Sequence, residues 1–162
     1  MPELDALARR LVRLDPAHAS TYRARARRAD RRLAALDART RDALTPCARR
    51  TVLTSHDAFS RFGRRYSLRF EPIAGVDPEQ EPDPRRLAAL TALARRTRAT
   101  TIFTEETVSP QVASVLAREV GVRTAVLSPL ETRTPGRGSL GYVERMDADV
   151  TALARGLDCV SR

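Results

Sequence analysis

His56 is the residue of this sequence best placed to hold a metal ion. The β-branched run TVLTS, residues 51–55, predicts a buried strand that ends at His56. The next stretch places Phe59, Phe62 and Tyr66 on one face of a predicted helix. His56 is therefore expected at the carboxyl edge of a strand, where open α/β sheets bind ligands, and a neutral imidazole is a common metal ligand. A local hydrogen-bonding role is the alternative, because a closed zinc site needs about four ligands.

Two catalytic interpretations use the same residues. Ser55, His56 and Asp57 are adjacent in the sequence, and adjacent residues cannot converge in space as a nucleophile, a base and an orienting acid. A His-Asp pair also occurs in metal-dependent phosphohydrolases, but these need further His and Asp ligands, and the only other histidine of this chain is His18. His18 follows an Asp-Pro pair and is expected in a solvated turn. We therefore expect no enzyme, and we interpret Asp57 as an acid that caps the next helix.

The composition is strongly basic. The 162 residues include 29 Lys or Arg against 20 Asp or Glu, a formal charge of +9, which raises the possibility of nucleic-acid binding. All of these basic residues are Arg, however, and the chain has no Asn, as is typical of proteins from GC-rich genomes. The arginines alternate with Ala, Asp and Leu, which favours solvated helix faces, with an anionic membrane or partner surface as the alternative. Aromatic residues are scarce, so no stacking platform for nucleic acid is expected.

Alternating patterns predict an α/β fold. A short helix at about 3–13 and a long helix ending near 44 precede strands at about 51–55, 68–72, 100–104 and 123–127. Helices are expected between the strands at about 57–66, 84–98 and 110–120, and after them at about 139–157. Strand-helix alternation predicts a small, mostly parallel four-stranded sheet with helices on both faces. We expect a helical segment at 1–45 and an α/β lobe at 46–162.

A series of short motifs follows His56 in a fixed order. The segment begins with His-Asp-Ala-Phe and continues with Gly-x-x-Pro-x-x-Glu-Pro from Gly75 and Ile-Phe-x-Glu ending at Glu105. Val-Ser-Pro, Gly-Val and Leu-x-Pro-Leu-Glu, which ends at Glu131, complete it. This order resembles the metal-binding solute-binding proteins of bacterial ABC importers, the zinc and manganese receptors. The resemblance runs from about Asp15 to the end of the chain.

The resemblance implies both a function and an incomplete architecture. Such receptors have two α/β lobes joined by a long helix, with the metal clamped between the lobes. The chain resembles the C-terminal lobe and that helix, with the N-terminal lobe missing. The first residues carry no signal-peptide pattern and no apolar run could span a membrane, so we expect a fragment of an extracytoplasmic, monomeric protein. The family includes lipoproteins resembling cell-adhesion proteins, and its members deliver metal to a membrane permease.

The same resemblance suggests roles for individual residues. His56 matches the ligand that the C-terminal lobe supplies, and an imidazole favours zinc over manganese. Many relatives have an Asp where this chain has Ser128, a poor zinc ligand. Glu131 is a weaker candidate ligand, and Glu105 is a candidate acceptor that orients His56, with an ordinary helix or turn role as its alternative. The alternative functions are a remnant that binds no metal and an Arg-rich protein for nucleic acid or anionic surfaces.

The two cysteines bracket the predicted lobe. Cys47 precedes its first strand and Cys159 follows its last helix, at places where family members often have Cys. The resemblance therefore suggests a disulfide, with two free thiols as the alternative. Metal binding by the pair is not expected, because neither lies in a Cys-x-x-Cys or Cys/His cluster.

Overall fold

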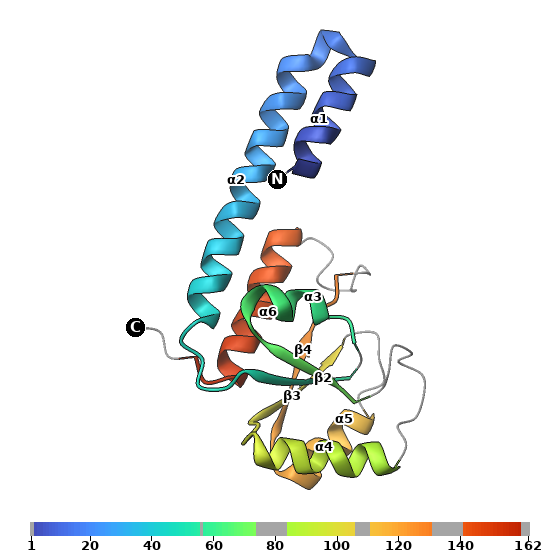
Figure 1. The fold of residues 1–162 in the computed structure, drawn as a ribbon, viewed down its shortest axis with the longest axis vertical. Coiled ribbons are helices and arrows are strands. Elements are labelled where there is room, and N and C mark those ends of the chain that lie inside the picture. Colours follow the sequence, from blue (N-terminus) through green and yellow to red (C-terminus); the bar gives the residue numbers. More distant parts are fainter. Residues whose placement is uncertain (1, 56, 74–83, 106–110, 131–140, 160–162) are drawn as a thin grey trace. The chain divides into compact units, whose positions relative to one another are not determined.

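The computed structural model describes residues 2–55, 57–73, 84–105, 111–130 and 141–159 (Figure 1). The chain divides into two compact units, Met1–Arg39 and Thr40–Arg162, and we describe each by itself. The dividing point lies inside the long helix. The functional division into a helical segment at 1–45 and an α/β lobe at 46–162 stays a prediction from the sequence.

The first unit is a helical hairpin. Helix α1 spans Pro2–Leu14, the short 3-10 helix η1 spans Pro16–His18, and α2 begins at Ala19 and continues to Leu44 in the second unit. The turn forms at Asp15-Pro16, as the sequence predicted. His18 Nδ1–H and the Tyr22 hydroxyl each donate to Asp15 Oδ2 at 2.8 Å, so His18 is an exposed turn residue.

The second unit contains a four-stranded parallel sheet, which confirms the predicted fold. Its strands are β1 Thr51–Thr54, β2 Arg69–Pro72, β3 Thr101–Glu105 and β4 Arg123–Leu127, arranged in the order β2-β1-β3-β4. All three neighbouring pairs are parallel. The four strands therefore end at the same edge of the sheet.

Helices cover both faces of this sheet (Figure 1). Alternate strand residues face opposite sides, so Val52 and Phe103 belong to one buried cluster and Leu53 and Ile102 to the other. The first cluster also contains residues from the end of α2, from α3 (Ser60–Tyr66) and from α6 (Tyr142–Gly156). The second contains residues from α4 (Pro84–Arg96) and α5 (Gln111–Val120). This two-sided burial is the reason that the central strands β1 and β3 have adjacent apolar residues, Val52-Leu53 and Ile102-Phe103.

The amino edge of the sheet is fastened by contacts between the two ends of the lobe. A disulfide joins Cys47 to Cys159. Beside it, Arg49 N–H donates to Leu157 O at 3.2 Å, and the Arg49 guanidinium forms an ion pair with Asp158. These contacts hold the segment before β1 against the end of α6.

Candidate functional site

The carboxyl edge of the sheet has the topology of a ligand-binding edge. β1 and β3 are neighbours, but the helix that follows β1, α3, packs on one face, while the helix that follows β3, α5, packs on the other. In open α/β sheets the crevice outside the strands at such a switch point is where ligands bind. β1 ends at Thr54 and β3 ends at Glu105 at this point of the sheet.

Buried polar side chains gather at the same edge. Thr54, Ser55, Thr104 and Ser128 are between 1% and 8% exposed, and all lie in or directly after the last positions of β1, β3 and β4. Ser55 N–H extends the ladder by donating to Phe103 O at 3.1 Å, and Thr104 Oγ1–H donates to Ala125 O at 3.4 Å. Because burying polar groups is costly unless they are hydrogen-bonded, this concentration marks an edge that is built differently from the apolar interior.

The structure describes the site residues predicted from the sequence to different extents. His56 and Glu131 lie outside the described residues. Glu105 ends β3, where its backbone pairs with Leu127 of β4, but its side chain is not described. β1 and β4, which precede His56 and Glu131 in the sequence, therefore end at the same edge as β3, which ends with Glu105 and lies between them.

Asp57 does not have the capping role that the sequence suggested. Helix α3 begins at Ser60, later than expected, and Phe59 is its N-cap residue without a side-chain cap. The exposed carboxylate of Asp57 instead accepts a hydrogen bond from the Ser60 hydroxyl. The Asp57 carboxylate therefore stabilises the turn between β1 and α3 by accepting from the Ser60 side chain. It does not accept from the first backbone N–H groups of the helix.

One acidic residue at this edge was missed by the sequence analysis. Asp149 of α6 is 4% exposed, and its Oδ1 accepts a hydrogen bond from Ser128 N–H at 2.9 Å. The signal was present in the sequence, because Asp149 lies one helical turn before the buried Leu153 and next to the buried Val150. An acid on the apolar stripe of a helix is expected to have a specific buried partner.

The described residues contain no cluster of metal-ligating side chains. No group of three or more His, Cys, Asp or Glu side chains is suitably placed for a metal ion among those residues. Within the same residues, no helix is long and apolar enough to cross a membrane.

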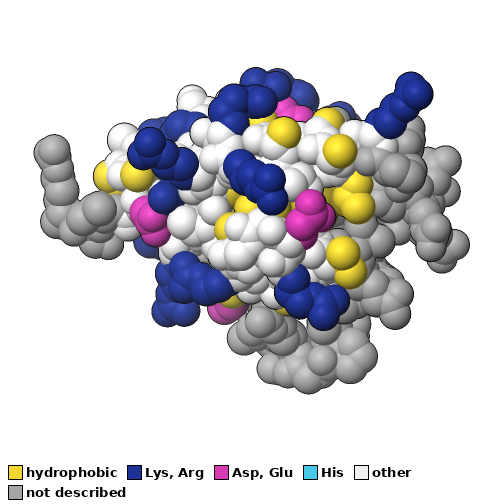
Figure 2. Space-filling view, turned by 90° about the horizontal axis from the view of Figure 1, so that it is seen from below, with side chains coloured by type: hydrophobic (Ala, Val, Ile, Leu, Met, Phe, Trp, Pro, Cys, Tyr) yellow, Lys and Arg dark blue, Asp and Glu magenta, His cyan; other side chains and the backbone are white. Residues whose placement is uncertain are grey.

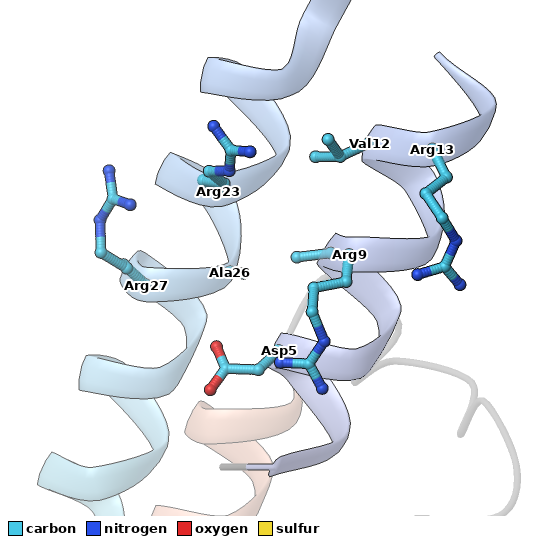
Figure 3. Close-up of a pocket in the computed structure, with 8 residues that line it drawn as sticks. Asp5, Arg9, Val12, Arg13, Arg23, Ala26 and Arg27 are labelled. Carbon is cyan, nitrogen blue, oxygen red and sulfur yellow. The ribbon is translucent and has the colours of Figure 1, made fainter. Parts of the chain in front are cut away.

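A groove of about 480 Å³ lies between α1 and α2 within the first unit (Figure 3). Its lining includes the apolar side chains of Ala8, Val12 and Ala26, and four arginines with one acid, Asp5. Figure 3 shows Val12 pointing from α1 toward α2, whereas the guanidinium groups of Arg13 and Arg27 lie on the outer sides of their helices. The arginines do not converge on one point, so the groove is not built to hold an anion.

On one face of the molecule the positive charge is dispersed. On the face shown in Figure 2, arginine side chains are separated by acidic and uncharged residues instead of forming one continuous patch. A surface that binds nucleic acid needs basic residues gathered on one face or along one stripe.

Solved structures establish the class of protein to which this fold corresponds. The laminin-binding protein Lmb of Streptococcus agalactiae, described as bifunctional with adhesin and metal-transporting activity, superimposes with a TM-score of 0.84 at 31% identity. The match covers 93% of this chain and 58% of that chain. The chain therefore has the fold of a part of that protein.

The chain belongs to the family described as ZnuA, zinc-uptake complex component A, periplasmic, whose model matches residues 3–156. It is 31% identical over 157 residues to the high-affinity zinc uptake system protein ZnuA of Bacillus subtilis, with 96% of this chain matched. It is 33% identical over 129 residues to the zinc-binding lipoprotein AdcA of Streptococcus pneumoniae, with 78% of this chain matched. The sequence-based recognition of the family is thus confirmed.

The relatives are considerably longer than this chain. The matched region is 49% of the Bacillus subtilis protein and 26% of the pneumococcal lipoprotein. The chain therefore spans about half or less of the curated relatives it matches.

Proposed function

We propose that this chain is the metal-capturing C-terminal lobe, with the interlobe helix, of a zinc solute-binding protein that serves an ABC importer. The observation that carries the proposal is the switch point between β1 and β3, directly before His56, in a chain of the zinc-uptake family. His56 is the proposed zinc ligand. Zinc is favoured over manganese because imidazole suits zinc and carboxylate oxygens suit manganese.

Glu131 and Glu105 have supporting roles in this proposal. Glu131 follows the turn after β4, at the same edge as the end of β1, and we assign it as a weaker ligand that reaches the metal directly or through water. Glu105 ends β3, between those two strands, and we assign it the orientation of the His56 ring by accepting its second N–H. One imidazole and one carboxylate are fewer than the about four ligands of a closed zinc site, so the lobe alone binds zinc weakly.

The partners and compartment follow from the same proposal. We place the protein outside the cytoplasm, as a monomer that delivers metal to a membrane permease, with no catalytic role and no nucleic-acid partner. The disulfide supports this compartment, because structural disulfides persist in oxidising environments and are rare in the cytosol. The dispersed arginines in Figure 2 fit a solvated surface better than a nucleic-acid interface.

The test compares the two histidines of the chain. Zinc titration of the 162-residue chain by calorimetry should show weak binding that His56→Ala abolishes. His18→Ala is the matched control, because His18 is engaged with Asp15 in the first unit, and it should leave binding unchanged. Affinity should fall as the pH drops below the ordinary imidazole pKa of about 6.5, since a ligating ring must be neutral.

Two results would contradict the proposal. Zinc binding that survives His56→Ala would refute the assignment of the ligand. A wild-type chain that binds no zinc at neutral pH would instead identify it as a remnant without metal affinity.

A further inference from the structure

Asp149 is a buried acid that the proposed ligand set does not include. Asp149 is 4% exposed. Its neighbours on α6, Val150 and Leu153, are 7% and 1% exposed and belong to the core cluster on one face of the sheet. A carboxylate in such a position is costly unless it makes specific hydrogen bonds.

The hydrogen-bond partner of Asp149 lies in the turn at the carboxyl edge. Asp149 Oδ1 accepts from Ser128 N–H at 2.9 Å, and Ser128 is the first residue after β4. A hydrogen bond to a carboxylate is shorter and stronger than one between neutral groups. Because both residues are 4% exposed, water does not compete readily for this N–H group.

The turn that this bond holds is tightly bent. Leu130 has a φ of 65°, in the left-handed region that non-glycine residues rarely adopt, and Leu130 N–H donates to Ser128 Oγ at 3.4 Å. The N–H group of Ser128 is thus bonded to Asp149 of α6, and the hydroxyl of Ser128 is bonded to the N–H group of Leu130. A backbone in an unfavourable conformation persists when its surroundings fix it, and the hydrogen bond from Leu130 N–H to Ser128 Oγ is one such contact.

We propose that Asp149 is a positioning residue for metal capture: it sets the path on which the chain leaves β4 at the switch-point edge. It does so without touching the metal, by fixing Ser128 and through it Leu130, the residue before Glu131. This inference rests on the proposed function for its link to zinc, but the fixing of the turn can be tested separately.

Three variants separate positioning from general stability. Asp149→Leu removes the acceptor oxygen and leaves the buried Ser128 N–H group without this hydrogen bond. Asp149→Asn keeps an oxygen that can accept from Ser128 N–H. Val150→Ala, the next residue of the same helix, is the control that loosens the core and leaves the Ser128 hydrogen bond in place.

The first measurement is amide hydrogen exchange of the metal-free chain. The ratio of the Ser128 exchange rate to that of the core residue Phe103 should rise about tenfold or more in Asp149→Leu, as expected for the loss of a hydrogen bond to a charged group. It should change little in Asp149→Asn and in Val150→Ala, because both keep the bond. An unchanged ratio in Asp149→Leu would overturn the proposal.

The second measurement is zinc affinity by calorimetry, with the melting temperature recorded for each variant. Asp149→Leu should weaken binding about tenfold, Asp149→Asn should restore it, and Val150→Ala should lower the melting temperature without weakening binding. Equal affinity in the wild type and Asp149→Leu would overturn the link to metal capture. If the wild type itself binds no zinc, the proposed function fails, while faster Ser128 exchange in Asp149→Leu would still support the role of Asp149 in the turn.

Discussion

Cys47 and Cys159 are separated by 112 positions in the sequence, and a disulfide brings their Cα atoms to 3.7 Å. The bond closes almost the whole α/β lobe into one loop. The two cysteines also form an antiparallel β-bridge at the junction where this loop closes. Arg49 reinforces that junction through its ion pair with Asp158 and its side-chain hydrogen bond to Arg98 O at 2.5 Å. The first and last segments of the lobe are thereby connected independently of the sheet.

Reduction of this disulfide should destabilise the lobe. Closing a loop of this length lowers the entropy of the unfolded chain by an amount worth at most about 4 to 5 kcal/mol. Urea unfolding followed by circular dichroism should therefore give a lower midpoint with dithiothreitol than without it. The double variant Cys47→Ser/Cys159→Ser should have the same unfolding midpoint as the reduced protein, and dithiothreitol should not change it. Equal midpoints for the oxidised and reduced wild type would show that the bond adds nothing to stability.

Replacement of Arg50 should destabilise the protein in a different way. Its half-buried guanidinium donates to Leu44 O at 2.5 Å, to Tyr66 O at 2.6 Å and twice to Ser67 O, at 2.9 and 3.0 Å. It thus satisfies carbonyl groups at the ends of both α2 and α3. Arg50→Ala should lower the free energy of unfolding by about 2 to 4 kcal/mol, since it leaves the part-buried carbonyls of Leu44 and Tyr66 without these hydrogen bonds.

The control for Arg50 is Arg64→Ala, an exposed position in α3. A surface substitution of this kind should change the free energy of unfolding by less than about 0.5 kcal/mol. Similar losses for the two variants in urea unfolding would mean that charge, and not the fixed hydrogen bonds, accounts for the effect of Arg50.

Gly63→Ala should be destabilising, although alanine is the better helix former by about 1 kcal/mol. A Cβ atom at Gly63 would lie 2.7 Å from Leu68 O and 2.9 Å from Phe70 Cδ2. The backbone oxygen cannot yield easily, because it belongs to the turn that leads from α3 into β2. We expect a net loss of about 1 to 3 kcal/mol, as for other overpacked sites, measured by thermal unfolding. A gain in stability would show that α3 can move away from β2 without cost.

The Asp15 turn should show a pH dependence at acid pH. Hydrogen bonds from His18 and then from Tyr22 lower the pKa of Asp15 from its ordinary value of 3.8. Because the folded-state pKa is depressed, the turn is stabilised above pH 3.8, and this contribution is lost as the pH falls through the lowered value. In an NMR titration of the Asp15 carboxyl carbon, His18→Ala should raise this pKa more than Tyr22→Phe does. An unchanged titration in both variants would refute the assigned hydrogen bonds.

The same turn should respond at alkaline pH through Tyr22. The hydrogen bond to Asp15 and the cost of burial raise the pKa of Tyr22 above its ordinary value of 10.0. A raised folded-state pKa means that the contribution is complete below pH 10.0 and is lost as the pH rises through the raised value. Asp15→Asn should lower the Tyr22 pKa, followed by ultraviolet absorbance of the phenolate. No shift in this variant would contradict the assigned contact.

The sequence by itself determined the alternation of elements and the two apolar faces. Val52 and Leu53 are neighbours that must be buried on opposite sides, and this requirement, repeated in Ile102 and Phe103, predicts a sheet covered on both faces. The motif order around His56 was sufficient to recognise the family. Boundaries were less well determined: α3 begins at Ser60 because Asp57 and the Ser60 hydroxyl stabilise a turn that helix periodicity does not report.

Only the tertiary structure decided which distant segments meet. The strand order that makes β1 and β3 neighbours, the choice of a disulfide over free thiols, and the contact of Asp149 with Ser128 all join residues far apart in the chain. Local patterns report which face of an element is buried, whereas such contacts depend on how the buried faces are packed together. The metal-ligand roles of His56 and Glu131, which lie outside the described residues, stay predictions from the sequence, while the edge that precedes them is a property of the fold.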